Sequence, residues 1–461
     1  MADSTRLVQP KNSLIRNFIL AFSQWFIAAG QPPHLTCISP TEGLQDAYRD
    51  LAYIGGIPDP NFLHRLQINH VSATEAKRED MTVEMEAYPL ADAELWKDKV
   101  ADVSKITVPT YVVASYSNTL HTMGTFRSWR SIGSKEKWLR IHDTQECPDY
   151  YNAESTEELR KFFDYYLLGK QNGWEKTPTV RYSILDFQAN NKTGLIAETF
   201  PPRESQLQRY YFSGRTRTLQ LNADDNELPL RYFPEALPCR VSFHTVFEKE
   251  TTFIGYPKVK LFMEAENTDD MDVFVWVQKI DKLGNVLSEF VVPNRNAALQ
   301  DFTQDGASAR HLDPILSTDE ISAYSFDRAE KLSGKEIVEL NIVLSPIGMT
   351  YNEGDTLRVM ISSKDEIGSV MPGTPGCITN NKGVHILHTG GKYVEESGFK
   401  NFNILLNTIT VNYQSTLNYF DNRSINTSAE SFNAKVKAFR SQIRGVRKID
   451  FFLFRLSNLF G

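Results

Sequence analysis

The sequence of this 461-residue chain predicts an α/β fold followed by an all-β fold. Between Thr107 and Arg181, two short apolar runs each lead into a polar loop, and a segment with helical spacing follows. Alternation of strand, loop and helix is typical of an α/β sheet, whose functional loops lie beyond the strand ends. Beyond Pro178 the pattern changes to period-two alternation with turn residues and without long helices, which indicates a β-sandwich.

The α/β prediction depends on three elements. Thr110 to Ser115 reads as a buried strand, and a second short strand is expected from Trp138 to Ile141. The third element is a helix that we expect to end at Gly169. Its apolar stripe consists of Leu159, Phe162, Phe163, Tyr166 and Leu167.

The β-sandwich prediction depends on strand-like segments separated by turn signals, one of which is the turn from Lys282 to Asn285. A final strand is expected after the segment from His388 to Tyr393. The strand-like segments are RYYFSG, RTLQLN, KVKLFMEAE, DVFVWVQKID, ELNIVLSP and DTLRVMISS.

Composition narrows the classes of function. A net charge of −7 argues against a nucleic-acid partner. The four cysteines are scattered without CxxC spacing, which argues against a metal site or a redox pair and predicts a reducing, cytoplasmic compartment. No pattern points to an organic cofactor, so we expect neither a metal nor a cofactor.

Three segments carry a family resemblance: TVPTYVVASYSNTLHTMGTF, KEKWLRIHDTQECPDYY and ELRKFFDYYLLGKQNGWEKTPTVR. Together they resemble the CocE/NonD hydrolases, the family of cocaine esterase and the X-prolyl dipeptidyl-peptidases. SARHLDPILSTDE and LSGKEIVELNIVLSPIGMTYNEGDTLRVMISSKD are similar to the C-terminal domain of the X-prolyl dipeptidyl-peptidases.

The resemblance implies a domain organisation. Residues 1–40 and 96–173 would form a partial α/β-hydrolase domain, and residues 41–95 would form a helical cap. Residues 174–431 would form a jelly-roll like that of X-prolyl dipeptidyl-peptidases. Residues 432–461 are expected to be a basic amphipathic tail, which would contact a membrane surface or a protein partner. The alternatives for this tail are a helix packed on the body and translated sequence outside the native frame.

The resemblance also places the family's Ser-His-Asp positions, and all three are occupied by other residues. Alignment on Gln24 and Trp25 puts Phe18 at the nucleophile, and phenylalanine has no hydroxyl that could attack an acyl group. Asn118 occupies the position of the acid and Glu146 the position of the histidine. His142 is an alternative base if the alignment shifts by one gap.

The N-terminal region leaves two questions open. The apolar segment from Phe18 to Ala29 is expected to be a buried helix, and the alternative is a secretory signal. Only three sheet strands are expected, at 34–40, 107–115 and 137–141, so the helix would lack much of the sheet that it packs against. The resemblance therefore suggests an N-terminally incomplete member of the family.

Two functions are compatible with these residues. The first is a serine hydrolase of the CocE/NonD type, acting on an ester or an X-Pro peptide, with weak or no activity in this chain. The second is a pseudo-hydrolase that binds a ligand or scaffolds a complex, or a non-hydrolytic tailoring protein of small-molecule biosynthesis. In either case the expected ligand is a small ester, acyl compound or peptide, and the family suggests a homodimer.

Overall fold

The computed structural model of the chain describes residues 11–17, 19–66, 80–118, 120–187, 191–287, 302–303, 313–318, 321–333, 335–365, 377–379, 381–393 and 398–404. The chain divides into one compact unit from Met1 to Leu405 and a second from Leu406 to Gly461. Every described residue belongs to the first unit, so the predicted tail at 432–461 lies outside the described residues.

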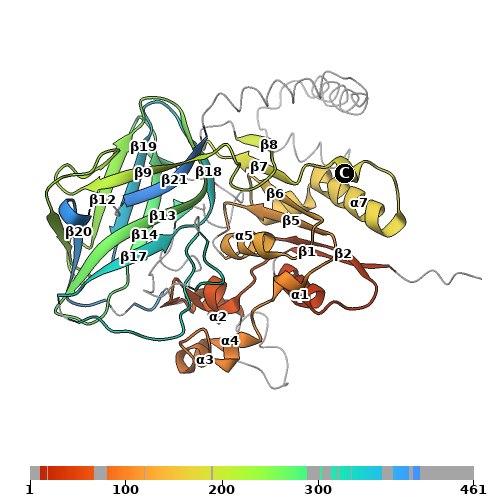
Figure 1. The fold of residues 1–461 in the computed structure, drawn as a ribbon, viewed down its shortest axis with the longest axis horizontal. Helices are drawn as coiled ribbons and strands as arrows, with labels where there is room; N and C mark the ends of the chain where they lie inside the picture. The colour runs from red at the N-terminus through yellow and green to blue at the C-terminus, as the bar shows by residue number, and fades with distance from the viewer. Residues whose placement is uncertain are drawn as a thin grey trace, which may run out of the picture. The chain divides into compact units, whose positions relative to one another are not determined.

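A six-stranded sheet forms the α/β part (Figure 1). Its strands follow the order β1, β2, β5, β6, β7, β8, and only β8 runs antiparallel to its neighbour. All six residues of β5 are buried, as expected for an apolar strand covered on both faces. The strands are β1 (Asn12–Asn17), β2 (Leu35–Thr41), β5 (Thr110–Ser115), β6 (Lys137–His142), β7 (Val180–Ile184) and β8 (Lys192–Ala197).

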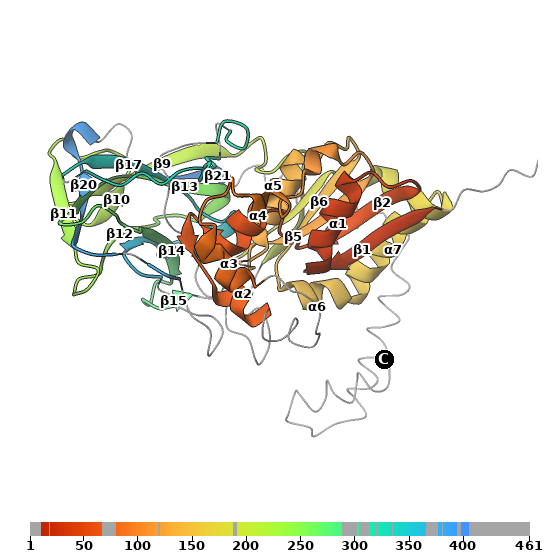
Figure 2. The same cartoon turned by 90° about the horizontal axis from the view of Figure 1, so that it is seen from below.

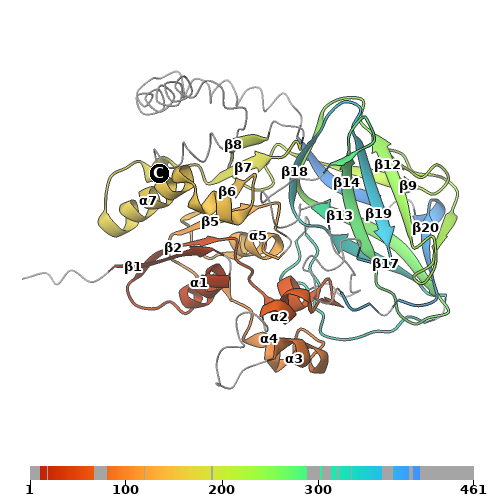
Figure 3. The ribbon, with the colours of Figure 1, turned by 180° about the vertical axis from the view of Figure 1, so that it is seen from behind.

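Helices cover both faces of this sheet (Figures 1 and 3). On one face, helix α7 (Ala153–Leu168) packs Leu159 and Phe162 against Tyr111 and Val113 of β5. It ends at Gly169, whose φ of +68° glycine adopts without steric cost, so the predicted helix end is confirmed. Helices α1 (Ile19–Ala29) and α5 (Thr122–Ser131) lie on the other face, and the short α6 (Glu146–Tyr151) precedes α7.

The sequence-based count of three sheet strands was wrong. It missed β1, β7 and β8. Strand β1 gives little signal because it contains only two apolar residues, Leu14 and Ile15. Strand β7 was missed because it continues directly from the segment that joins the two domains. Helix α1 packs on this sheet beside β1 and β2 (Figure 2), with Ala21, Trp25 and Ala28 buried.

A small helical segment with its own core follows β2. Tyr48 stacks on Tyr53 with 4.7 Å between ring centroids, and Trp96 meets Tyr48 edge-on at 5.5 Å. Leu63 and Met85 also belong to this core. The elements are the π-helix η1 (Tyr48–Ala52), strands β3 (Tyr53–Ile54) and β4 (Ile57–Pro58), helices α2 (Asn61–Leu66), α3 (Met81–Ala87) and α4 (Glu94–Lys97), and the 3-10 turn η3 (Val103–Lys105).

The second half of the described chain is the predicted β-sandwich. Alternate residues of β13 and β19, such as Leu261 and Val359, belong to one hydrophobic core. The elements of the sandwich are the 3-10 turn η5 (Gly391–Tyr393) and the strands β9 (Gln206–Ser213), β10 (Thr218–Gln220), β11 (Leu228–Tyr232), β12 (Arg240–Val246), β13 (Thr251–Glu266), β14 (Phe274–Ile280), β15 (Val286–Leu287), β16 (Phe302–Thr303), β17 (Ile337–Val343), β18 (Ile347–Tyr351), β19 (Thr356–Ser362), β20 (Val384–Thr389) and β21 (Gly398–Ile404). The 3-10 turn η4 (Trp174–Lys176) precedes β7, and its Trp174 packs in the core of the α/β part.

A buried lysine joins the end of β7 to the sandwich. The Nζ atom of Lys279 lies 3.0 Å from Asp186 Oδ1 and 3.1 Å from Asp355 Oδ2. It also donates to the carbonyl oxygens of Asp186 and Thr350, at 2.8 and 2.7 Å. The lysine side chain is completely buried, so these acceptors replace its hydration.

Within the described part of the chain, no helix is both long enough and apolar enough to cross a bilayer.

Candidate functional site

Polar side chains gather where three neighbouring parallel strands end. Glu42 follows β2, Asn118 and His121 follow β5, and Glu146 follows β6, whose last residue is His142. Parallel strands present their carboxyl ends at one edge of the sheet, which is where α/β folds place their ligand sites. Glu42 and His121 are at most 1% exposed, and His142 and Glu146 are at most 5% exposed.

The predicted acid and base positions are in contact. Asn118 Nδ2 donates a hydrogen bond to Glu146 Oε2 and lies 2.9 Å from His121 Nδ1. Asn118 Oδ1 accepts hydrogen bonds from the backbone N–H groups of Leu120 and His121, at 3.0 and 3.2 Å. The turn at the start of α5 therefore fixes Asn118 between His121 and Glu146.

His142, the alternative base, faces carboxylates. Its Nε2 atom lies 2.8 Å from Glu42 Oε1 and 3.9 Å from Asp149 Oδ2. The contact with Glu42 has an ion-pair distance but not the angles of a hydrogen bond. Phe18, the predicted nucleophile position, lies outside the described residues, between the last residue of β1, Asn17, and the first residue of α1, Ile19.

Glu42 was not predicted as a site residue. Its backbone adopts a φ of +49°, in the left-handed region that residues other than glycine rarely occupy. Such backbone conformations cluster at functional sites. A charged residue directly after a buried strand was the available signal in the sequence. His121, three residues after Asn118, was not among the predicted site residues either.

Burial and proximity set the charges of this cluster. Burial raises the pKa of Glu42, but the neighbouring His142 and His121 lower it by more, so the net shift is downward. Burial and the charge of Glu42 raise the pKa of Glu146 to about 8. Burial lowers the pKa of His121 to about 4, although Glu42 opposes that shift. Burial and the neighbouring Glu42 carboxylate therefore favour the uncharged form of Glu146, burial favours the uncharged form of His121, and the nearby histidines favour the charged form of Glu42.

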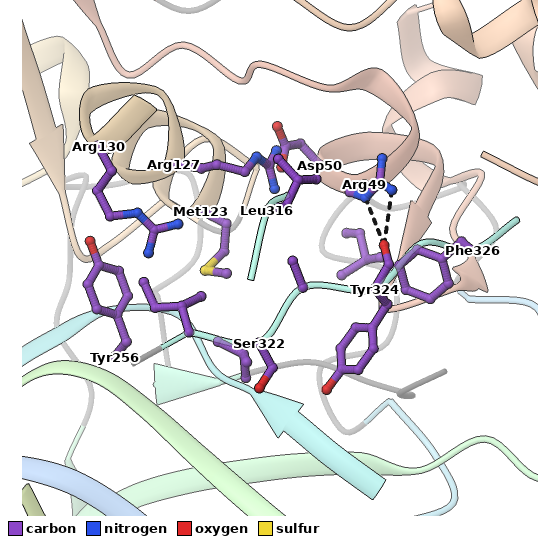
Figure 4. Close-up of a pocket in the computed structure, with 15 residues that line it drawn as sticks. Arg49, Asp50, Met123, Arg127, Arg130, Tyr256, Leu316, Ser322, Tyr324 and Phe326 are labelled. Atoms are coloured by element: carbon purple, nitrogen blue, oxygen red, sulfur yellow. Dashed lines mark hydrogen bonds and ion pairs between the residues drawn. The ribbon is translucent and has the colours of Figure 1, made fainter. Parts of the chain in front are cut away.

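A pocket that opens to solvent lies between α5, η1 and the sandwich (Figure 4). Arg127 pairs with the buried Asp50 at 2.5 Å, and the Arg130 guanidinium lies 5.1 Å from the centre of the Tyr256 ring. Apolar side chains that include Met123 line the rest. The pocket thus combines an apolar wall with arginine side chains, two of which are paired with aspartates, which suits a ligand with an apolar body and a polar group.

Comparisons with known proteins identify the family. Two crystal structures of a CocE/NonD family hydrolase from Staphylococcus aureus are each 30% identical to this chain, with a TM-score of 0.78. The match covers 86% of this chain and 72% of the other. The chain belongs to the CocE/NonD family of hydrolases. The predicted resemblance and the predicted fold class are both confirmed.

Three further comparisons concern parts of this chain or its fold alone. The family model of the X-Pro dipeptidyl-peptidase C-terminal non-catalytic domain matches residues 172–395. An α-amino acid ester hydrolase is 11% identical with a TM-score of 0.62, over 85% of this chain and 76% of the other, which shows a shared fold. A family model described as a transposase matches residues 362–456, most of which lie outside the described residues. No curated protein matches.

Proposed function

We propose that this member of the CocE/NonD family binds a small ester, acyl compound or peptide without hydrolysing it through a serine. Hydrolysis by the family's mechanism needs a nucleophile, an imidazole base and an acid that orients the base. By the family resemblance, the nucleophile position holds Phe18, the position of the imidazole base holds Glu146 and the position of the acid holds Asn118.

The contact between Asn118 and Glu146 is the observation that carries this proposal. In a working triad, a carboxylate accepts a hydrogen bond from an imidazole and stabilises the imidazolium that forms. Here the two partners are an amide donor and a carboxyl acceptor. This pair cannot take a proton from a hydroxyl group and pass it to a leaving group in the way that an imidazole does.

The pocket in Figure 4 supports retained binding. Its arginine side chains are held in place, since Arg127 is paired with Asp50 and Arg49 donates to the carbonyl oxygens of Tyr324 and Ser325, at 3.0 Å each. Side chains that are already fixed lose little entropy when a ligand binds.

Binding and turnover should be measured together, by calorimetry and by release of nitrophenol or nitroaniline from a p-nitrophenyl ester and an X-Pro anilide. We expect binding without turnover. Met123→Trp should fill the pocket and weaken binding at least tenfold, whereas Ser131→Trp, at the exposed end of the same helix, should leave binding unchanged.

A gain-of-function variant tests whether the three substituted triad positions are the reason that the chain lacks serine hydrolase activity. The triple variant Phe18→Ser, Asn118→Asp, Glu146→His restores the residue types of a Ser-His-Asp triad. We expect this variant to acquire ester hydrolysis that the wild-type chain lacks. Turnover by the wild-type chain that equals or exceeds that of the triple variant would refute the proposal.

We also propose a reducing, cytoplasmic location. The support is that the thiols of Cys37, Cys147 and Cys239 are free.

A further inference from the structure

Three buried side chains of metal-ligating type converge at the strand ends. Glu42, His121 and Glu146 each offer one ligand atom, and these three atoms lie within 4.8 Å of one another. They come from three loops that are distant in the sequence, so the fold and not a local motif brings them together. All three side chains are at most 5% exposed.

The carboxylate of Glu42 provides a second, independent observation. Both of its oxygens are buried, and within the part of the chain that the structure describes no donor reaches either oxygen with the angles of a hydrogen bond, although His142 and Ser115 lie close enough to lower the pKa of Glu42. A buried carboxylate without hydrogen bonds is costly unless a positive charge compensates it. His142 Nε2 lies 2.8 Å from one of these oxygens but without the angles of a hydrogen bond. The carboxylate oxygens therefore still have lone pairs that could coordinate an ion.

Two neighbouring side chains contact the three residues of metal-ligating type. Asn118 contacts both His121 and Glu146, and His142 lies against Glu42. Because Asn118 Nδ2 is a donor, the His121 Nδ1 atom that faces it is an acceptor, so the imidazole proton is on Nε2 and an ion that binds at Nε2 would displace it. Two neighbours thus hold the three ligand groups before any ion binds.

We propose that Glu42, His121 and Glu146 bind a first-row divalent transition-metal ion, with Zn²⁺ as the representative. One imidazole and two carboxylates form a mixed nitrogen and oxygen set, which suits Zn²⁺ better than Mg²⁺ or Ca²⁺. Ligand atoms on a tetrahedral Zn²⁺ ion lie roughly 3.4 Å apart, a spacing that small side-chain rotations could reach from the present one. Three protein ligands leave a coordination position open.

The metal site goes beyond the proposed function, because it concerns an ion and needs no ester or peptide ligand. It is tested by titrating the full chain, freed of metal with a chelator, with Co²⁺ followed by visible absorption and with Zn²⁺ followed by calorimetry. We expect one equivalent to bind, with the Co²⁺ bands of a four- or five-coordinate site.

Glu42→Gln keeps the shape of the side chain and removes its charge. It should weaken the binding of Co²⁺ and Zn²⁺ by at least about 100-fold, which is more than the loss expected for a residue that only contacts a metal ligand. Glu146→Gln is the second variant in case Glu42→Gln does not fold, which circular dichroism reports. Cys147→Ser is the matched control, because this exposed thiol next to Glu146 is a competing ligand.

Three results would overturn the proposal: no Co²⁺ bands with the wild-type chain, equal affinity in the folded Gln variants, or loss of binding in Cys147→Ser. None of them bears on the serine question, since the titration contains no substrate. Conversely, ester turnover by the wild-type chain would refute the proposed function and leave the metal titration unaffected.

Discussion

Replacing Lys279 with methionine should cost a large part of the stability of the fold. The change removes one positive charge that lies within 3.1 Å of both Asp186 and Asp355, of which Asp355 is 2% exposed. Removing one partner of a buried ion pair typically costs about 3–5 kcal/mol, because the remaining charge stays buried without compensation. Lys279 also donates to two carbonyl oxygens, so we expect the upper half of that range.

The assay is the free energy of unfolding from urea denaturation, followed by tryptophan fluorescence. Lys192→Met is the matched control, because Lys192 pairs with Glu250 at 3.1 Å while both side chains are more than a third exposed. Exposed ion pairs contribute about 0–1 kcal/mol, so this control should change little. If the two variants lose similar amounts of stability, the reasoning about the buried lysine is wrong.

Two further predictions test packing and pH dependence. Gly124→Ala should lower the free energy of unfolding by about 1–3 kcal/mol, because the added methyl group would meet Leu44 Cα at 2.8 Å. Helix propensity alone would favour alanine, so a free energy of unfolding that is unchanged or higher would contradict this prediction. Burial lowers the pKa of His385 from 6.5 to about 4, so the folded state binds a proton at this side chain less readily than the unfolded state does. The free energy of unfolding of the wild-type chain should therefore fall by up to about 3 kcal/mol as the pH is lowered from 6.5 to 4. His385→Leu should remove that part of the pH dependence, as measured by urea denaturation across this range, and an unchanged slope would refute the assignment.

The regular elements were predictable because their signals are local. The stripe that includes Leu159 and Phe162 does face the sheet, and Gly169 does end the helix. The alternation in KVKLFMEAE and DTLRVMISS likewise corresponds to β13 and β19. Strand β1 was missed because its position is decided by pairing with β2, and its sequence, NSLIRN, has almost no periodic signal.

The site was only partly predictable, because it is assembled from segments far apart in the sequence. Asn118 and Glu146 were placed by resemblance, and the structure then brought them into contact with each other and with His121. Glu42 could not be linked to them from the sequence, since its role depends on the order of β2, β5 and β6 in the sheet. The buried ion pairs of Lys279 could not be predicted either. A lysine within a strand ordinarily indicates a solvent-facing position, and its partners Asp186 and Asp355 are distant in the sequence.

The most direct test of the central claim is labelling of the full wild-type chain with a fluorophosphonate, followed by intact mass spectrometry. Only an activated serine forms the covalent adduct at an appreciable rate. We predict no adduct on the wild-type chain. In the triple variant with Phe18→Ser, Asn118→Asp and Glu146→His, we predict an adduct on the serine that the first of these substitutions introduces. A stoichiometric adduct on any serine of the wild-type chain would show that an activated nucleophile is present and would contradict the account.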